Sequence, residues 1–210
     1  MSAGARDVVL RRIRDALGPA PAAPEVERAY RHAGEPVAFD AVERFCEIVA
    51  DYDATVHRVR GDGLGEALAR VCRERGAARL VTPVGLEWRI DGVELVADDP
   101  PLSARDLDAI DGVVTGCAAA IAQTGTIVLD GAGASGRRAI TLVPDLHLCV
   151  VRADQVVPAV PDGVAAVAPA VAEGRPITFV SGPSATADIE LNRVQGVHGP
   201  RTLDVFLVEG

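Results

Sequence analysis

Residues 176–210 read PITFVSGPSATADIELNRVQGVHGPRTLDVFLVEG. The two apolar runs in this stretch, 177–180 and 203–208, have the β-branched and aromatic composition of buried strands. Turn-forming and reactive side chains fill the segment between them. In open α/β sheets, ligands bind outside the carboxyl ends of strands. We therefore expect a ligand site at the sheet edge, where the first of these strands ends.

Toward the N-terminus, short apolar runs alternate with amphipathic segments. The runs predict strands at 54–59, 79–82, 93–97, 113–116, 126–129 and 146–151. The amphipathic segments predict helices at 7–17, 39–51, 65–75 and 103–110, helical stretches at 154–160 and 164–173, and a helix-like segment at 185–191. This alternation predicts an α/β fold with a single mainly parallel sheet covered by helices.

The N-terminal part differs in composition from the rest. A short amphipathic helix is followed by the Pro/Ala-rich run 19–24, which is typical of a stiff, extended linker. We therefore divide the chain into an N-terminal helix and linker at 1–36 and an α/β domain at 37–210. The helix is expected to dock on its own domain, on a sister subunit or on a partner.

Composition excludes several classes of function. The net charge of the 210 residues is −9, and all 21 basic residues are arginine, so there is no basic stripe for nucleic acid and no lysine chemistry. No apolar run approaches the ~20 residues of a membrane span. The first residues lack the apolar core of an export signal. We expect a cytoplasmic protein that has no membrane span and does not bind nucleic acid.

Cysteine spacing argues against metal chemistry in this chain. Cys46, Cys72, Cys117 and Cys149 lie far apart in apolar runs, without C-x-x-C or zinc-type spacing. They are expected to be buried thiols. We therefore predict no metal site and no iron–sulfur cluster here.

Residues 131–136 match the G-x-G-x-x-G pattern after a strand. A dinucleotide site also needs a helix opening at the third glycine, and the β-like run 137–143 is too short for it. We predict a flexible loop and no cofactor. Arg137 and Arg138 remain able to close such a loop over an anionic ligand.

The turn at 123–126 has two interpretations. Gly125 permits close backbone approach, and the hydroxyls of Thr124 and Thr126 can donate to a carboxylate or phosphate. The same pattern also fits a tight turn with capping threonines. Both interpretations stay open.

The segment after residue 180 carries further candidate ligand-binding residues, namely Ser181, Gly182, Ser184 and Thr186. Asp188 and Glu190 are candidate catalytic residues that favour a hydroxyl-bearing, sugar-like or cationic group, because their charges already offset a helix dipole. The alternative is a capped helix with acidic residues in its first turn.

The loop at 196–201 precedes the last strand. His198 lies between turn-forming residues and is a candidate acid/base or hydrogen-bond donor. Arg201 is a candidate carboxylate clamp. His147 lies inside a predicted strand, which favours a structural role. His57 is expected at the surface.

Four motifs together resemble the lactate utilization protein C family, the LUD domain. They are IAQTGT at 121–126, LVPDLH at 142–147, SGPSATADIE at 181–190 and GVHGPR at 196–201. The resemblance implies a fold similar to ribose-phosphate isomerases (the NagB/RpiA type), CoA transferases and formyltetrahydrofolate cyclo-ligases. It also implies a role in oxidising L-lactate to pyruvate beside two iron–sulfur partner proteins, which would carry the clusters.

The chain departs from the family pattern at Gln123, where many relatives are expected to have an acidic residue. Glutamine does not ionise, so an acid/base or nucleophilic role at this position is doubtful.

Three functional hypotheses follow. The first is a subunit of an L-lactate-oxidising assembly that binds a small anionic hydroxy-acid or sugar-like ligand. The second is a stand-alone isomerase or transferase on the same fold. The third is a non-catalytic scaffold docked through the N-terminal helix. A homo-oligomer is compatible with each of them.

Overall fold

The computed structural model describes residues 4–18, 25–86, 88–183, 185–186, 194–195 and 198–210. It divides into two compact units, Met1–Tyr30 and Arg31–Gly210. The first unit contains α1 (Ala5–Leu17), an amphipathic helix without a buried residue. Its end is marked by Gly18 at positive φ, whose amide donates to the Arg14 carbonyl.

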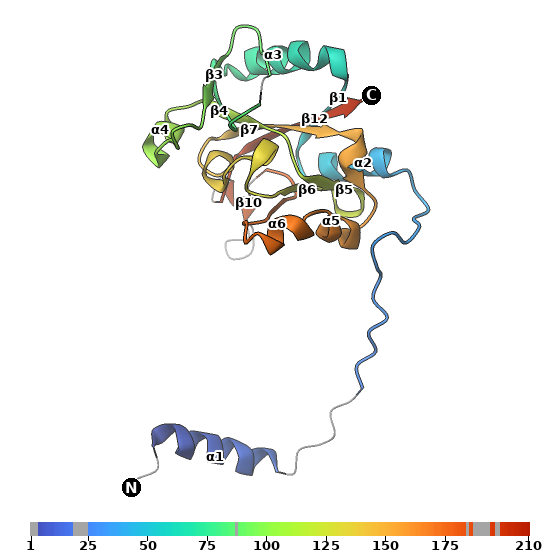
Figure 1. Cartoon of the computed structure of the whole chain (residues 1–210), viewed down its shortest axis with the longest axis vertical. Helices are drawn as coiled ribbons and strands as arrows, with labels where there is room; N and C mark the ends of the chain where they lie inside the picture. The colour runs from blue at the N-terminus through green and yellow to red at the C-terminus, as the bar shows by residue number, and fades with distance from the viewer. Residues whose placement is uncertain (1–3, 19–24, 87, 184, 187–193, 196–197) are drawn as a thin grey trace. The chain divides into compact units, whose positions relative to one another are not determined.

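A six-stranded sheet forms the centre of the second unit (Figure 1). Every neighbouring pair in it is parallel, which confirms the predicted mainly parallel α/β architecture. In spatial order the strands are β1 (Thr55–Arg60), β12 (Thr202–Glu209), β7 (Leu146–Arg152), β4 (Gly112–Thr115), β2 (Arg79–Thr82) and β3 (Glu94–Ala97).

A smaller four-stranded sheet lies against it. Its order is β8 (Val156–Val157), β5 (Ala119–Ile121), β6 (Thr126–Leu129) and β9 (Thr178–Val180). β6 pairs antiparallel with both of its neighbours, whereas β5 and β8 are parallel. A separate short ribbon pairs β10 (Ala185–Thr186) with β11 (Val194–Gln195).

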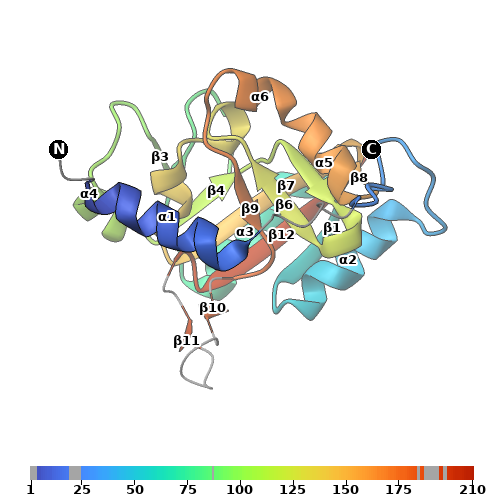
Figure 2. The same ribbon diagram turned by 90° about the horizontal axis from the view of Figure 1, so that it is seen from below.

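Helices and sheets stack in layers (Figures 1 and 2). The helices of this unit are α2 (Ala41–Asp51), α3 (Leu64–Arg75), α4 (Ala104–Asp108), α5 (Val160–Ala166) and α6 (Ala168–Ala172). Helix α3 covers one face of the large sheet, while α2 and the small sheet cover the other. Helices α5 and α6 lie on the outer side of the small sheet (Figure 1).

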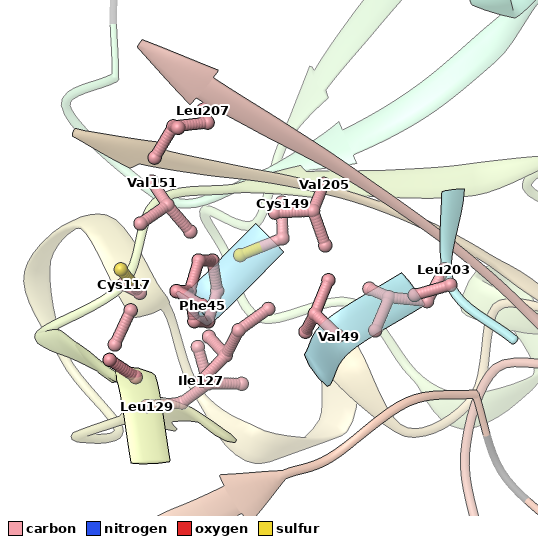
Figure 3. Packing of buried hydrophobic residues seen from close by; sticks show 13 residues of the cluster. Phe45, Val49, Cys117, Ile127, Leu129, Cys149, Val151, Leu203, Val205 and Leu207 are labelled. Atoms are coloured by element: carbon pink, nitrogen blue, oxygen red, sulfur yellow. The ribbon is translucent and has the colours of Figure 1, made fainter. Parts of the chain in front are cut away.

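The main core lies between α2 and the two sheets (Figure 3). Phe45 and Val49 of α2 point into it and are fully buried. Cys149 and Val205 reach the same core from β7 and β12, and Ile127 from β6. Alternate residues of β7 and β12 face α3 instead, as expected for strands that are buried on both faces.

Two predicted helical segments have a different structure. Residues 154–160 form a 3-10 turn and then β8, and α5 begins only at Val160, with Pro161 in its first turn. The β-branched pair Val156–Val157 extends the small sheet beside β5 instead of joining the helix. In the helix-like segment at 185–191, Ala185–Thr186 is strand β10, and 187–191 lies outside the described residues.

The β-like run at 137–143 also differs from the prediction, because its middle forms a 3-10 turn at Arg138–Thr141. Strand β5 was not predicted at all. Alanine is depleted in strands, and only burial between β6 and β8 explains this strand. Among the described residues, no helix is both long and apolar enough to cross a membrane.

Candidate functional site

A pocket of about 200 Å³ opens where the small sheet meets the amino-terminal ends of β7 and β12. Two predicted site segments line it together, namely 181–183 after β9 and 198–200 before β12. From the sequence, we expect a site where the strand at 177–180 ends, and the pocket lies beside that strand end. On the large sheet, however, the pocket borders the amino ends of strands, because His198 precedes β12.

Arg138 is the cation of this pocket. Its Nη1 donates to the backbone oxygen and the hydroxyl of Thr141, at 2.9 and 3.1 Å, and its Nη2 donates to the His198 oxygen at 3.1 Å. No carboxylate in the described part of the chain pairs with it. Burial lowers the pKa of the Arg138 guanidinium below its usual value. A half-buried cation without a counter-charge favours an anionic ligand.

His147 lies at the base of the pocket and is 2% exposed. Its Nε2 is 2.7 Å from the hydroxyl oxygen of Thr115, which is fully buried on β4. This hydrogen bond fixes the orientation of the ring. His147 therefore lines the pocket while its ring is held by a buried hydrogen bond.

A chain of hydroxyl groups links two of the predicted motifs. The Thr126 hydroxyl lies 2.7 Å from the Thr124 hydroxyl and 2.7 Å from that of Ser181. Ser181 lines the pocket, whereas the two threonines lie behind it. The turn at 123–126 thus supports the pocket through hydrogen bonds.

The glycines of both motifs are positions of close backbone packing. Gly125 has φ +58°, and a Cβ atom there would lie 2.7 Å from Ile48 Cγ2 and 2.8 Å from the Val49 nitrogen. Gly182 has φ +93°, and a Cβ would lie 2.5 Å from the Tyr52 oxygen. Both turns therefore pack against α2 and the residue that follows it.

The remaining predicted residues are not all gathered in the pocket. His198 lines it, but Arg201 pairs with Asp145 at 2.8 Å, and both side chains are 59% exposed. Ser184, Asp188 and Glu190 lie outside the described residues. Thr186 belongs to β10, and its side chain is likewise outside the description.

A family model described as the LUD domain matches residues 42–208. The chain belongs to the LUD domain family. This confirms the resemblance drawn from the four sequence motifs. The matched range contains every residue that lines the pocket.

Similar proteins are found in several bacteria. Lactate utilization protein C of Deinococcus radiodurans is 48% identical over 171 residues, which cover 80% of this chain and 80% of that protein. Lactate utilization protein C of Geobacillus kaustophilus is 33% identical over 121 residues, 54% of this chain and 50% of that protein. The uncharacterized protein YkgG of Escherichia coli is 29% identical over 159 residues, with 69% and 68% covered.

A solved structure supports the fold. The crystal structure of a DUF162 family protein from Deinococcus radiodurans aligns with a TM-score of 0.70 and 43% sequence identity. The alignment covers 80% of this chain and 96% of that one.

Sequence reasoning missed several pocket residues of this LUD domain. Thr141, Thr178 and Phe179 line the pocket, and Phe179 is 52% exposed although its strand was expected to be buried. Arg138 was noted only as a neighbour of the glycine-rich loop. The sequence does offer one signal for Arg138. No acidic residue lies between 131 and 144, so this arginine has no ion-pair partner close to it in sequence.

The LUD domain also contains a buried charge cluster away from the pocket. His57 Nε2 lies 2.8 Å from Asp204 Oδ1, and Arg75 Nε donates to Asp204 Oδ2 at 3.2 Å. Burial alone would raise the pKa of Asp204, but the hydrogen bonds from His57 and Arg75 outweigh it and lower that pKa. The prediction of His57 as a surface residue was wrong, since its side chain is 13% exposed.

The cysteines of the LUD domain are free thiols. Cys72, Cys117 and Cys149 are buried and Cys46 is half-buried. Burial raises the pKa of the Cys72 thiol to about 11, so it stays protonated at neutral pH.

Proposed function

We propose that this chain is a lactate utilization protein that binds a small anionic hydroxy acid in the pocket below His198. The observation that carries the proposal is Arg138, a half-buried cation without a carboxylate partner among the described residues. The pocket volume of about 200 Å³ suits a small metabolite, because pockets for drug-sized ligands occupy roughly 300–1,000 Å³. The names of the Deinococcus and Geobacillus relatives support lactate as the metabolite.

Each polar group of the pocket has a role in this proposal. Arg138 binds the carboxylate of the acid through its guanidinium N–H groups. In this proposal Ser181 and His198, which line the pocket, bind the hydroxyl group or move its proton. His147, held by Thr115, forms the floor on which the acid rests.

A binding experiment tests the pocket. L-lactate is titrated calorimetrically into the purified chain, and Arg138→Gln is expected to weaken binding about tenfold or more, the scale of a lost charge-assisted hydrogen bond. Arg152→Gln is the matched control, because Arg152 forms an exposed ion pair with Asp154 outside the pocket. Equal affinity of all three proteins, or no binding of L-lactate at all, contradicts the proposal.

At the level of the assembly, we propose a non-redox subunit that works beside two iron–sulfur proteins in the oxidation of L-lactate to pyruvate. The four scattered cysteines support this division of labour. Deleting the gene is expected to abolish growth on L-lactate in a strain without a paralogue. The Arg138→Gln gene should fail to restore growth, whereas the Arg152→Gln gene should restore it. Normal growth of the deletion strain would overturn this role.

A second candidate is a stand-alone isomerase or transferase. It is favoured by the presence of two histidines, His147 and His198, in one pocket lining. It predicts turnover of a sugar phosphate or a CoA ester by the purified chain, whereas the subunit proposal predicts none.

A third candidate is an assembly scaffold. Helix α1 has no buried residue, and Val9, Ile13 and Leu17 on it are 49–69% exposed. Removing residues 1–24 should then break a complex with partner proteins and leave the α/β domain folded. A truncated chain that still binds its partners would exclude this version.

A further inference from the structure

A second cavity lies beside the glycine-rich loop at 131–136, and no residue of it belongs to the pocket of the proposed function. It has a volume of about 220 Å³. Its walls come from the residues after β2 and β3 and from the loop itself, namely Pro83, Val84, Asp98, Pro101, Ala132, Gly133, Gly136 and Arg137. It therefore borders the carboxyl ends of parallel strands, where open α/β sheets bind ligands.

Arg137 is held at this cavity with one edge of its guanidinium already bound. Its Nε donates to Asp98 Oδ2, and its Nη2 donates to Asp98 Oδ1 at 2.8 Å and to the Leu102 oxygen. Within the described chain Nη1 makes no hydrogen bond. The Arg137 side chain is 35% exposed, whereas that of Asp98 is 5% exposed. Asp98 thus anchors the arginine, and Nη1 has two N–H donors left for a ligand.

The acceptor capacity of Asp98 is used by the protein. Its Oδ1 accepts from the Leu102 amide at 2.9 Å and from Arg137 Nη2 at 2.8 Å, and its Oδ2 accepts from Arg137 Nε. This arrangement keeps the arginine rigid, which reduces the entropy lost when it binds a further anion.

The glycines of the loop shape the cavity. Gly136 has φ +63°, and a Cβ there would lie 2.9 Å from Pro83 Cγ, so glycine lets the loop pack against the end of β2. Gly133 has φ +50°, yet nothing lies within 4 Å of its Cβ position. Gly133 is thus favoured by its backbone conformation and leaves open space above the loop.

We infer that this cavity is a second binding site, for a small molecule that carries an oxyanion, either phosphate or carboxylate. Nη1 of Arg137 binds the oxyanion, and the apolar walls at Pro83, Val84 and Pro101 contact the remainder of the molecule. The site is independent of the proposed lactate pocket, whose cation is the neighbouring Arg138.

Charge substitutions at Val84 test this inference without disturbing the core. Val84 lines the cavity and is 59% exposed. The backbone amide shifts of Gly133 and Gly136 are followed by ¹H–¹⁵N NMR during titration with sodium phosphate and, in a second arm, with sodium acetate, at constant ionic strength. We expect saturable shifts at these two glycines with at least one of the two anions, and the preferred anion identifies the oxyanion class.

Val84→Glu should weaken this binding about threefold or more, and Val84→Arg should preserve or strengthen it, because a charge a few ångströms from the anion acts through Coulomb interaction. Val171→Glu is the matched control, since Val171 is an equally exposed valine on α6 outside the cavity. Unchanged spectral dispersion shows that each variant is folded. The inference is overturned if neither anion shifts the two glycines saturably, or if the Glu and Arg variants at position 84 bind alike.

The same titrations distinguish binding at this second site from binding in the lactate pocket. Ligands of the lactate pocket are expected to shift the amides of Ser181, Gly182 and Gly199, which line only that pocket. Shifts confined to those three residues during the phosphate and acetate titrations contradict the second site and leave the first intact.

Discussion

Arg137 and Arg138 are neighbours in sequence with different surroundings. Arg137 binds the buried Asp98, whereas Arg138 has no carboxylate partner among the described residues and lines the pocket with His198. The sequence predicts that both arginines can close the glycine-rich loop over an anionic ligand. It could not separate them, because the direction of each side chain is decided by the 3-10 turn that begins at Arg138.

Gly125 is required by packing against α2. Gly125→Ala is expected to lower the free energy of unfolding by about 3 kcal/mol, since it combines a strained backbone with a clash at Val49. Gly174→Ala serves as the control, because Gly174 also has positive φ but nothing lies near its Cβ position. The control should lose only about 1 kcal/mol. Urea unfolding measures both, and equal losses would contradict the packing explanation.

The hydrogen bond between Thr115 and His147 is the buried support of the pocket floor. Thr115→Val keeps the shape of the side chain but leaves the imidazole nitrogen without its partner, so we expect a loss of about 2 kcal/mol. Thr202→Val, on β12, removes a hydroxyl that makes no hydrogen bond in the described structure and should be nearly neutral. The comparison is made by denaturant unfolding, and it fails if the two variants are equally stable.

At the scale of elements, β12 is stabilised by a charge cluster. The pKa of Asp204 is lowered in the folded protein, so its contribution to stability is present above the unfolded pKa of about 3.9 and is lost as pH falls through the folded pKa. Asp204→Asn should cost about 2 kcal/mol at pH 7, because it removes the negative charge from the buried acceptor of the hydrogen bonds from His57 and Arg75. Unfolding curves between pH 2 and 7 should show that the variant has lost part of the acid sensitivity below about pH 4. An unchanged slope in that range would contradict the assignment.

The strands of the large sheet were the best predicted elements. Their apolar runs are continuous, as expected for strands buried on both faces. The predicted strand 79–82 coincides with β2, and the predicted strand 146–151 ends one residue before β7 does. In the small sheet, the predicted strand 126–129 coincides with β6, but β5 and β8 were not predicted. Residues 119–121 are alanine and isoleucine without a turn signal, and Val156–Val157 is too short to show a period. β5 pairs with the neighbouring β6 and with the distant β8, and β8 pairs with β5.

The candidate site was predicted in part. The motifs at 181–183 and 198–200 meet in one pocket, and the turn at 123–126 supports it from behind. The roles of Thr141 and Phe179 depend on the contact between the two sheets. Such a contact leaves no local pattern in the sequence, so hydrophobic periodicity cannot predict it.

At the scale of the whole molecule, the chain consists of two compact units, Met1–Tyr30 and Arg31–Gly210. We expect a chain that begins at Arg31 to have a free energy of unfolding within about 0.5 kcal/mol of the full chain, because no residue of α1 is buried. Calorimetric melting of both proteins measures this. A clearly lower melting temperature of the shortened chain would show that the first unit stabilises the domain.

The position of β12 in the large sheet has a consequence for synthesis. Among the described strands of that sheet, β1 pairs with β12 alone, and β12 is the last of them in the chain. While the ribosome is still making the segments between them, β1 has an unpaired edge and β7 lacks one of its two neighbours. Unpaired strand edges can pair with other chains and so promote aggregation. Pairing between strands that are distant in sequence is also slow. The domain therefore completes its central sheet only after β12 has left the exit tunnel.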